Sequence, residues 1–138
     1  MVKHEVTATK TSHRYVEGIG RRKTAVARVR ITPGTAEGNV NDKPLTAYFQ
    51  LARLAALAAS PLAVAGSKLT FTAKVHSGGI QAQAEAVRHG LSRALVILDA
   101  ELKKQLRVSG FLTRDPRMVE RKKFGFKKAR RAPQWQKR

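Results

Sequence analysis

The segment TAVARVRI, from Thr24 to Ile31, alternates apolar and polar residues with a period of two. Arg28 and Arg30 fall on one face of this pattern, and the opposite face is apolar, with Ala25, Ala27, Val29 and Ile31. Because successive side chains of a strand point to opposite faces of its sheet, the pattern predicts a strand with one buried face. The sequence Thr32-Pro33-Gly34 is typical of a turn and should end the strand.

Three other segments are expected to complete a sheet of about four strands. Residues 15–20 can pair with the first strand through a turn at residues 20–23. A short strand is predicted at Gly38 to Val40, before the turn residues Asn41 and Asp42. KLTFTAKV, from Lys68 to Val75, alternates as cleanly as the opening segment and predicts another half-buried strand.

Two stretches have helical character. Residues 46–59 are rich in Ala and Leu and contain no Gly or Pro, which favours a helix. The apolar stretch from Leu51 to Gly66 is too short to span a bilayer, and we interpret it as a buried helix followed by a loop, with the break at Pro61.

After Ser77-Gly78-Gly79 the hydrophobic period changes from two to that of a helix. A break near Asp99 is expected to divide this region into two helices. Four polar residues are predicted to lie away from the apolar stripe: Arg88, His89, Ser92 and Arg93. The stripe itself consists of Val87, Leu91, Ala94, Leu95, Leu98 and Leu102.

These patterns predict an α+β fold in a single small domain. The chain of 138 residues is long enough for one such domain. We expect a flexible N-terminal arm at residues 1–12, a globular α+β domain at residues 13–110 and an extended basic tail at residues 111–138.

The composition is strongly basic, with 28 Lys and Arg against 9 Asp and Glu, a formal net charge of +19. Such a charge favours a polyanionic partner, above all the phosphate backbone of nucleic acid, and an anionic membrane surface is the main competitor. Cysteine is absent, which excludes disulfides and thiolate zinc sites. The first 14 residues lack the apolar core of a secretory signal, so we expect a cytoplasmic protein. A membrane partner is not expected, because the basic tail has no apolar face opposite its charges.

No catalytic site is predicted. The four histidines have no zinc-binding spacing, and the nine carboxylates form no pair suited to acid–base catalysis. GIGRRKT, at residues 18–24, lacks the full spacing of a phosphate loop. The segment Ser77-Gly78-Gly79 precedes a helix, so its free N–H groups could bind an anion. Equally, the two glycines could serve only to form a tight turn. We therefore expect no enzyme activity, cofactor, metal or small-molecule substrate.

The tail has the composition of a peptide that runs through folded RNA. Residues 111–138 hold 11 of the basic residues and 2 of the acidic ones, and aromatic residues are interspersed among them: Phe111, Phe124, Phe126 and Trp135. Cations can contact phosphates while aromatic rings stack on unpaired bases. In the domain, the residues predicted to bind RNA are Arg21, Arg22, Lys23, Arg28 and Arg30. In the tail they are Arg114, Arg117, Arg121, Lys122, Lys123, Lys127, Lys128, Arg130 and Arg131.

Two blocks of the chain resemble a known family. RYVEGIGRRKTAVARVRITPG, residues 14–34, and LTRDPRMVERKKFGFKKARRAPQWQKR, residues 112–138, are similar to the signature blocks of the ninth small-subunit ribosomal protein, most closely its bacterial and organellar branch. The resemblance implies helices packed on one face of the sheet and a left-handed βαβ crossover. It also implies binding to ribosomal RNA in the head of the small subunit of a cytoplasmic or organellar ribosome, beside other head proteins. The tail would reach the peptidyl-site tRNA with Lys137 and Arg138.

The sequence departs from the family where the long helix begins, at SGGIQAQAEAVR, residues 77–88. Ala82 and Glu85 stand where the family commonly has glycine. A carboxylate is unfavourable beside phosphate, so we expect this helix start not to make the usual RNA contact. Composition alone leaves one alternative open, a general nucleic-acid-binding protein of the nucleoid or RNA-chaperone kind.

Overall fold

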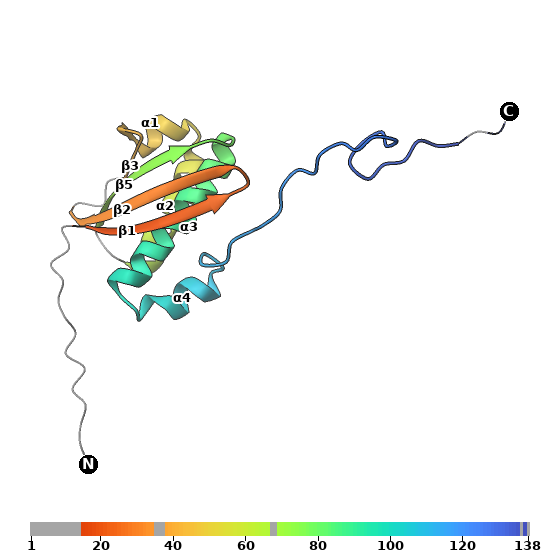
Figure 1. Cartoon of the computed structure of the whole chain (residues 1–138). Coiled ribbons are helices and arrows are strands. Elements are labelled where there is room, and N and C mark those ends of the chain that lie inside the picture. Colours follow the sequence, from red (N-terminus) through yellow and green to blue (C-terminus); the bar gives the residue numbers. More distant parts are fainter. Residues whose placement is uncertain (1–14, 35–37, 67–68, 136, 138) are drawn as a thin grey trace, which may run out of the picture.

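The computed structural model describes residues 15–34, 38–66, 69–135 and 137. Helices cover one side of a sheet, and the C-terminal chain runs away from this body (Figure 1). The expected N-terminal arm, residues 1–12, and the predicted tRNA-binding residue Arg138 lie outside the described residues.

The sheet has five strands in the order β1-β2-β5-β3-β4. Neighbouring strands are antiparallel except β3 and β5, which are parallel. The chain between those two forms β4 and the first two helices. The strand beyond the predicted four is β4, whose two residues are too few to show a pattern. The bounds are β1 (Val16–Arg22), β2 (Ala25–Pro33), β3 (Gly38–Val40), β4 (Lys43–Pro44) and β5 (Leu69–His76).

The β1–β2 hairpin turns later than the sequence suggested. The expected turn at residues 20–23 is wrong, because β1 continues to Arg22, which pairs with Ala25. The loop is only Lys23 and Thr24, and Lys23 has a positive φ of 49°. Gly20 serves helix packing instead of turning, since a Cβ there would lie 1.9 Å from the carbonyl oxygen of Ala86.

The single helix expected at residues 46–59 is divided into α1 (Leu45–Phe49) and α2 (Ala52–Ala65) by Gln50, whose φ is 55°. The break expected at Pro61 is also wrong, because α2 continues through it. Proline cannot donate a bond to the carbonyl of Leu57 four residues earlier. The hydroxyl of Ser60 donates to that carbonyl instead, at 2.8 Å.

The remaining helices are α3 (Ile80–Leu98) and α4 (Leu102–Val108), so the predicted break near Asp99 is confirmed. α3 packs against β1 and β2, and α2 packs against α3. Most of the predicted stripe is buried, but Leu98 is 48% exposed. Ser92, expected at the surface, is fully buried and donates to the carbonyl of Arg88.

The chain after α4 first remains with the body and then departs. Phe111 and Leu112 pack against the hydrophobic core. From residue 111 onward the described residues contain no helix or strand. This part follows a long path away from the sheet (Figure 1).

Candidate nucleic-acid interface

The face of the sheet opposite the helices is polar and basic. Arg28 and Arg30 point from β2 to this face, where Lys74 of β5 lies beside Arg28 in the strand register. These residues line a hollow together with Asn39, Thr72 and one carboxylate, that of Asp42. Like charges directly opposite each other on neighbouring strands destabilise a sheet, so this arrangement favours an anion over the face.

One carboxylate serves both arginines of β2. The Nε atoms of Arg28 and Arg30 donate to the two carboxylate oxygens of Glu17 at 2.5 and 2.9 Å. The bond from Arg28 is the main cause that lowers the pKa of Glu17. The guanidinium of Arg30 also lies 4.6 Å from the ring centre of Tyr15. Two guanidinium groups over one carboxylate leave this face positive and hold its cations in place.

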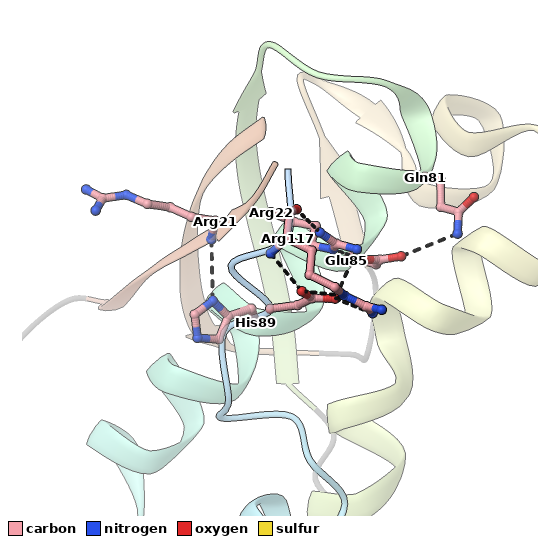
Figure 2. Close-up of polar contacts among 7 residues, drawn as sticks. Arg21, Arg22, Gln81, Glu85, His89 and Arg117 are labelled. Atoms are coloured by element: carbon pink, nitrogen blue, oxygen red, sulfur yellow. Dashed lines mark hydrogen bonds and ion pairs between the residues drawn. The ribbon is translucent and has the colours of Figure 1, made fainter. Parts of the chain in front are cut away.

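A second polar cluster joins β1, α3 and the start of the tail (Figure 2). Arg22 donates from Nε to Glu85 at 2.5 Å, and its Nη2 lies 3.1 Å from a carboxylate oxygen of Asp115. Its Nη1 donates to the carbonyl of Arg117 at 2.8 Å. The Arg22 side chain is only 13% exposed. Arg22 therefore fastens the first residues of the tail to the body.

Both carboxylates of this cluster are held by arginine. Asp115 accepts bonds from the guanidinium and the backbone amide of Arg117, which hold its pKa well below the usual range. Glu85 lies against Arg22, so its negative charge is directed to a protein cation. This position explains how α3 tolerates a carboxylate where the sequence suggested conflict with phosphate.

His89 and Arg88 lie beneath the same part of the tail. The backbone N–H of Arg21 donates to Nδ1 of His89 at 3.4 Å. Burial lowers the pKa of His89, and the nearby Arg93 lowers it further, against a hydrogen bond with the backbone of Leu112. The guanidinium of Arg88 lies 5.3 Å from the ring centre of Phe111. Both residues were predicted to lie away from the apolar stripe of the helix, and in the structure the tail covers them.

The rest of the tail carries cations with few partners. Glu120 accepts from Arg130 at 2.8 Å, which closes a loop, and this bond lowers the pKa of Glu120. Phe124 at the loop is 98% exposed. Several predicted RNA-binding residues are exposed and form no ion pair with any described residue: Lys23, Arg114, Arg121, Lys122, Lys123, Lys127, Lys128, Arg131 and Lys137.

The predicted residues that the structure describes therefore fall into four groups. Arg28 and Arg30 lie on the open sheet face, and Lys23 lies in the β1–β2 loop. Arg21 and Arg22 lie beside the first residues of the tail, 111–117, which we call the tail root and which include Arg114 and Arg117. The others are spread along the rest of the tail. The sequence did not indicate the contribution of Arg88 and His89 to this cluster, or the pairing of Glu85 with Arg22. The spacing of Glu85 and Arg88, three apart on one helix, could have placed them on a common face.

Other kinds of site find no support among the described residues. They include no group of three or more His, Cys, Asp or Glu side chains able to hold a metal ion. Within the same ranges, no helix is both long enough and apolar enough to cross a bilayer.

The fold and its charges define a small α+β protein with a basic sheet face and a basic tail, a class suited to polyanions. The family described as ribosomal protein S9/S16 matches residues 20–138, from the middle of β1 through the tail. The chain belongs to this family, as the resemblance of its two signature blocks had predicted. It is an RNA-binding protein of the small ribosomal subunit with a structural role in translation.

Proposed function

We propose that this chain binds ribosomal RNA in the head of the small subunit and contacts the peptidyl-site tRNA with the end of its tail. The sheet face and the tail root hold the body on RNA, beside neighbouring head proteins. The tail runs through the RNA. No catalytic role is assigned to any residue.

The observation that carries this proposal is the distribution of charge. In the body, Arg22, Arg28 and Arg30 share carboxylates with one another or with the tail root. Residues 118–138, in contrast, contain nine basic residues and one acidic residue. A segment with so many cations and no core of its own gains most from a partner with closely spaced phosphates.

Specificity cannot come from this charge alone. Contacts to phosphates position a protein but carry no sequence information. The exposed rings of Phe124 and Trp135 can stack on unpaired bases, and the rigid sheet face can fit one RNA shape. We therefore expect recognition of a folded RNA rather than of a base sequence.

Sedimentation of a native lysate at moderate salt tests the ribosomal part of the proposal. A stoichiometric peak of this chain with the small subunit, persisting in translating ribosomes, is the expected result. A distribution between free protein and DNA-containing fractions would instead support the general nucleic-acid-binding alternative.

Deletion of Lys137 and Arg138 tests the tRNA contact separately. Lysine offers a compact charge and arginine a planar fork that suits phosphate, so their loss should weaken tRNA binding in the peptidyl site. Subunit assembly should remain intact because the other cations of the tail are unchanged. Replacement of Lys122 and Lys123 by Gln removes the same charge elsewhere and provides the control. Equal loss of tRNA binding in both variants would contradict a specific role for the tail end.

A further inference from the structure

The root of the tail forms a hollow of about 250 Å³ between β1, α3 and residues 111–117. Five arginines line it, together with the carboxylates of Glu85 and Asp115, which leaves an excess of three positive charges. Because Arg22 and Arg117 hold both carboxylates, the excess falls on Arg21, Arg88 and Arg114.

Arg88 has a buried donor that lacks an acceptor, and its position is fixed by an aromatic ring, as expected of a side chain that binds a ligand. Its Nε is buried and has no hydrogen-bond partner among the described residues. A buried charged donor without an acceptor is costly, so such a group requires an explanation. The ring of Phe111 lies against the guanidinium and limits its movement.

We propose that this hollow binds a phosphate diester of the RNA backbone, with Arg88 and Arg114 as its principal cations. The inference rests on the proposed function and assigns it one site, formed only when the tail root lies on α3. A planar guanidinium fork matches the geometry of phosphate oxygens, and a concave surface strengthens the interaction by excluding water.

The positive field of the hollow is evident at His89. Arg93, Arg114 and Arg88 each lower the pKa of its imidazole, in addition to burial. A phosphate diester only accepts hydrogen bonds, so it can satisfy the arginine donors of the hollow. A nucleobase would need both donors and acceptors from the lining. The acceptors of Asp115 and Glu85 are already paired with arginine, so they are not free for a base.

Phosphate-ethylation interference on purified small-subunit ribosomal RNA tests the site, with the full-length protein and the variants Arg88→Gln and Arg114→Gln. Ethylation removes the charge of single phosphates, and positions that matter are depleted from the bound RNA. Lys103→Gln is the matched control, since it removes one charge from the exposed surface of α4.

With the wild-type protein, ethylation of one or two phosphates should reduce binding. Ethylation of the same phosphates should have no effect on the binding of Arg88→Gln and Arg114→Gln, but should still reduce the binding of Lys103→Gln. The affinity of Arg88→Gln should fall about tenfold, and its salt slope should decrease by about 0.7 to 0.9. Interference identical to wild type in both arginine variants would overturn the inference.

Two further outcomes are distinguishable. If Arg88→Gln does not fold, as its thermal unfolding would reveal, Arg114→Gln decides, because that side chain is exposed and has no ion pair among the described residues. Wild-type protein that does not bind the RNA at moderate salt would contradict the proposed function itself and remove the basis of this site.

Discussion

The body and the tail of this protein use the same kind of residue in opposite ways. In the body, arginine stabilises structure: Arg22 is 13% exposed and contacts three other residues across β1, α3 and the tail root. In the tail beyond Arg117, described side chains form one ion-paired contact, between Glu120 and Arg130. Arg22 therefore stabilises the fold at the tail root, whereas most cations beyond Arg117 are available to a partner.

The tightest feature of the body is the contact of β1 with α3, and replacing Gly20 with Ala should have the largest effect on stability. The new Cβ would lie 1.9 Å from the carbonyl oxygen of Ala86 and 2.3 Å from the amide nitrogen of Gly90. Neither backbone atom can move without displacing the helix. We expect the free energy of unfolding to fall by about 3 kcal/mol or more, measured by urea denaturation.

Gly79→Ala is the matched control for this prediction. Gly79 has extended backbone angles, and no heavy atom lies within 4 Å of a Cβ built there. Its substitution should change the free energy of unfolding by less than about 1 kcal/mol. Similar losses at the two glycines would contradict close packing of β1 on α3 as the cause.

Arg22→Gln should have the next largest effect, because it separates the tail root from the body. The change leaves Glu85, whose side chain is 19% exposed, without its cation. A loss of about 2 kcal/mol in the free energy of unfolding is expected, since a partly buried charge loses its partner. Faster hydrogen exchange of the Arg117 amide, which donates to Asp115, would show that the tail root loosens.

Arg28→Gln tests whether this effect belongs to the cluster rather than to any lost charge. Arg28 is also paired with a glutamate, but its side chain is 56% exposed. Ion pairs at the surface contribute little, so the loss should be clearly smaller than at Arg22. An equal loss would mean that general electrostatics, and not the tail root, determines the stability of the body.

The pH dependence of stability should report on His89. Its pKa is lowered in the folded protein, so the unfolded chain takes up a proton near pH 6.5 at which the folded one remains neutral. The unfolded state then binds more protons, and stability falls as pH decreases below about 6.5. The slope should not exceed about 1.4 kcal/mol per pH unit.

His89→Gln should remove this part of the pH dependence. The groups that oppose a charge on His89 are Arg93 and Arg88 on α3 and Arg114 on the tail, so protonation must place a cation among arginines. Glu17, Asp115 and Glu120 have lowered pKa values and lose their contributions only at more acidic pH. An unchanged slope between pH 7 and 5.5 in the variant would contradict this assignment.

Much of the fold could be predicted from the sequence, because a strand or helix with one buried face repeats its apolar residues with a regular period. The alternation in β2 and β5 and the stripe of α3 all predicted the observed elements. The failures lie where contacts between distant segments decide. From the sequence alone, Gly20 suggests a turn, and only the structure shows that it allows α3 to pack closely on β1. Pro61 suggests the end of a helix, and only the structure shows that Ser60 donates a hydrogen bond to the carbonyl of Leu57.

The candidate site was accessible only in part, for the same reason. Charge density identified the basic residues, but not which of them other residues hold. Glu85 suggested a conflict with RNA, and only the fold shows that Arg22 lies beside it. Arg88 appeared to be one more solvated cation, because Phe111 is 23 positions away in the sequence yet lies against it in the structure.

A chain shortened to end at Arg117 should show the smallest effect on stability and the sharpest contrast with the body. Among the described residues, the hydrogen bonds and ion pairs of the removed segment, residues 118–138, are all within that segment, and none reaches the body. The urea midpoint at moderate salt should therefore match that of the full chain. Its RNA affinity should collapse, with a salt slope lower by up to about six units if all nine basic residues contact phosphates. A large shift of the midpoint would show that the tail stabilises the body, and the division between the two regions would then fail.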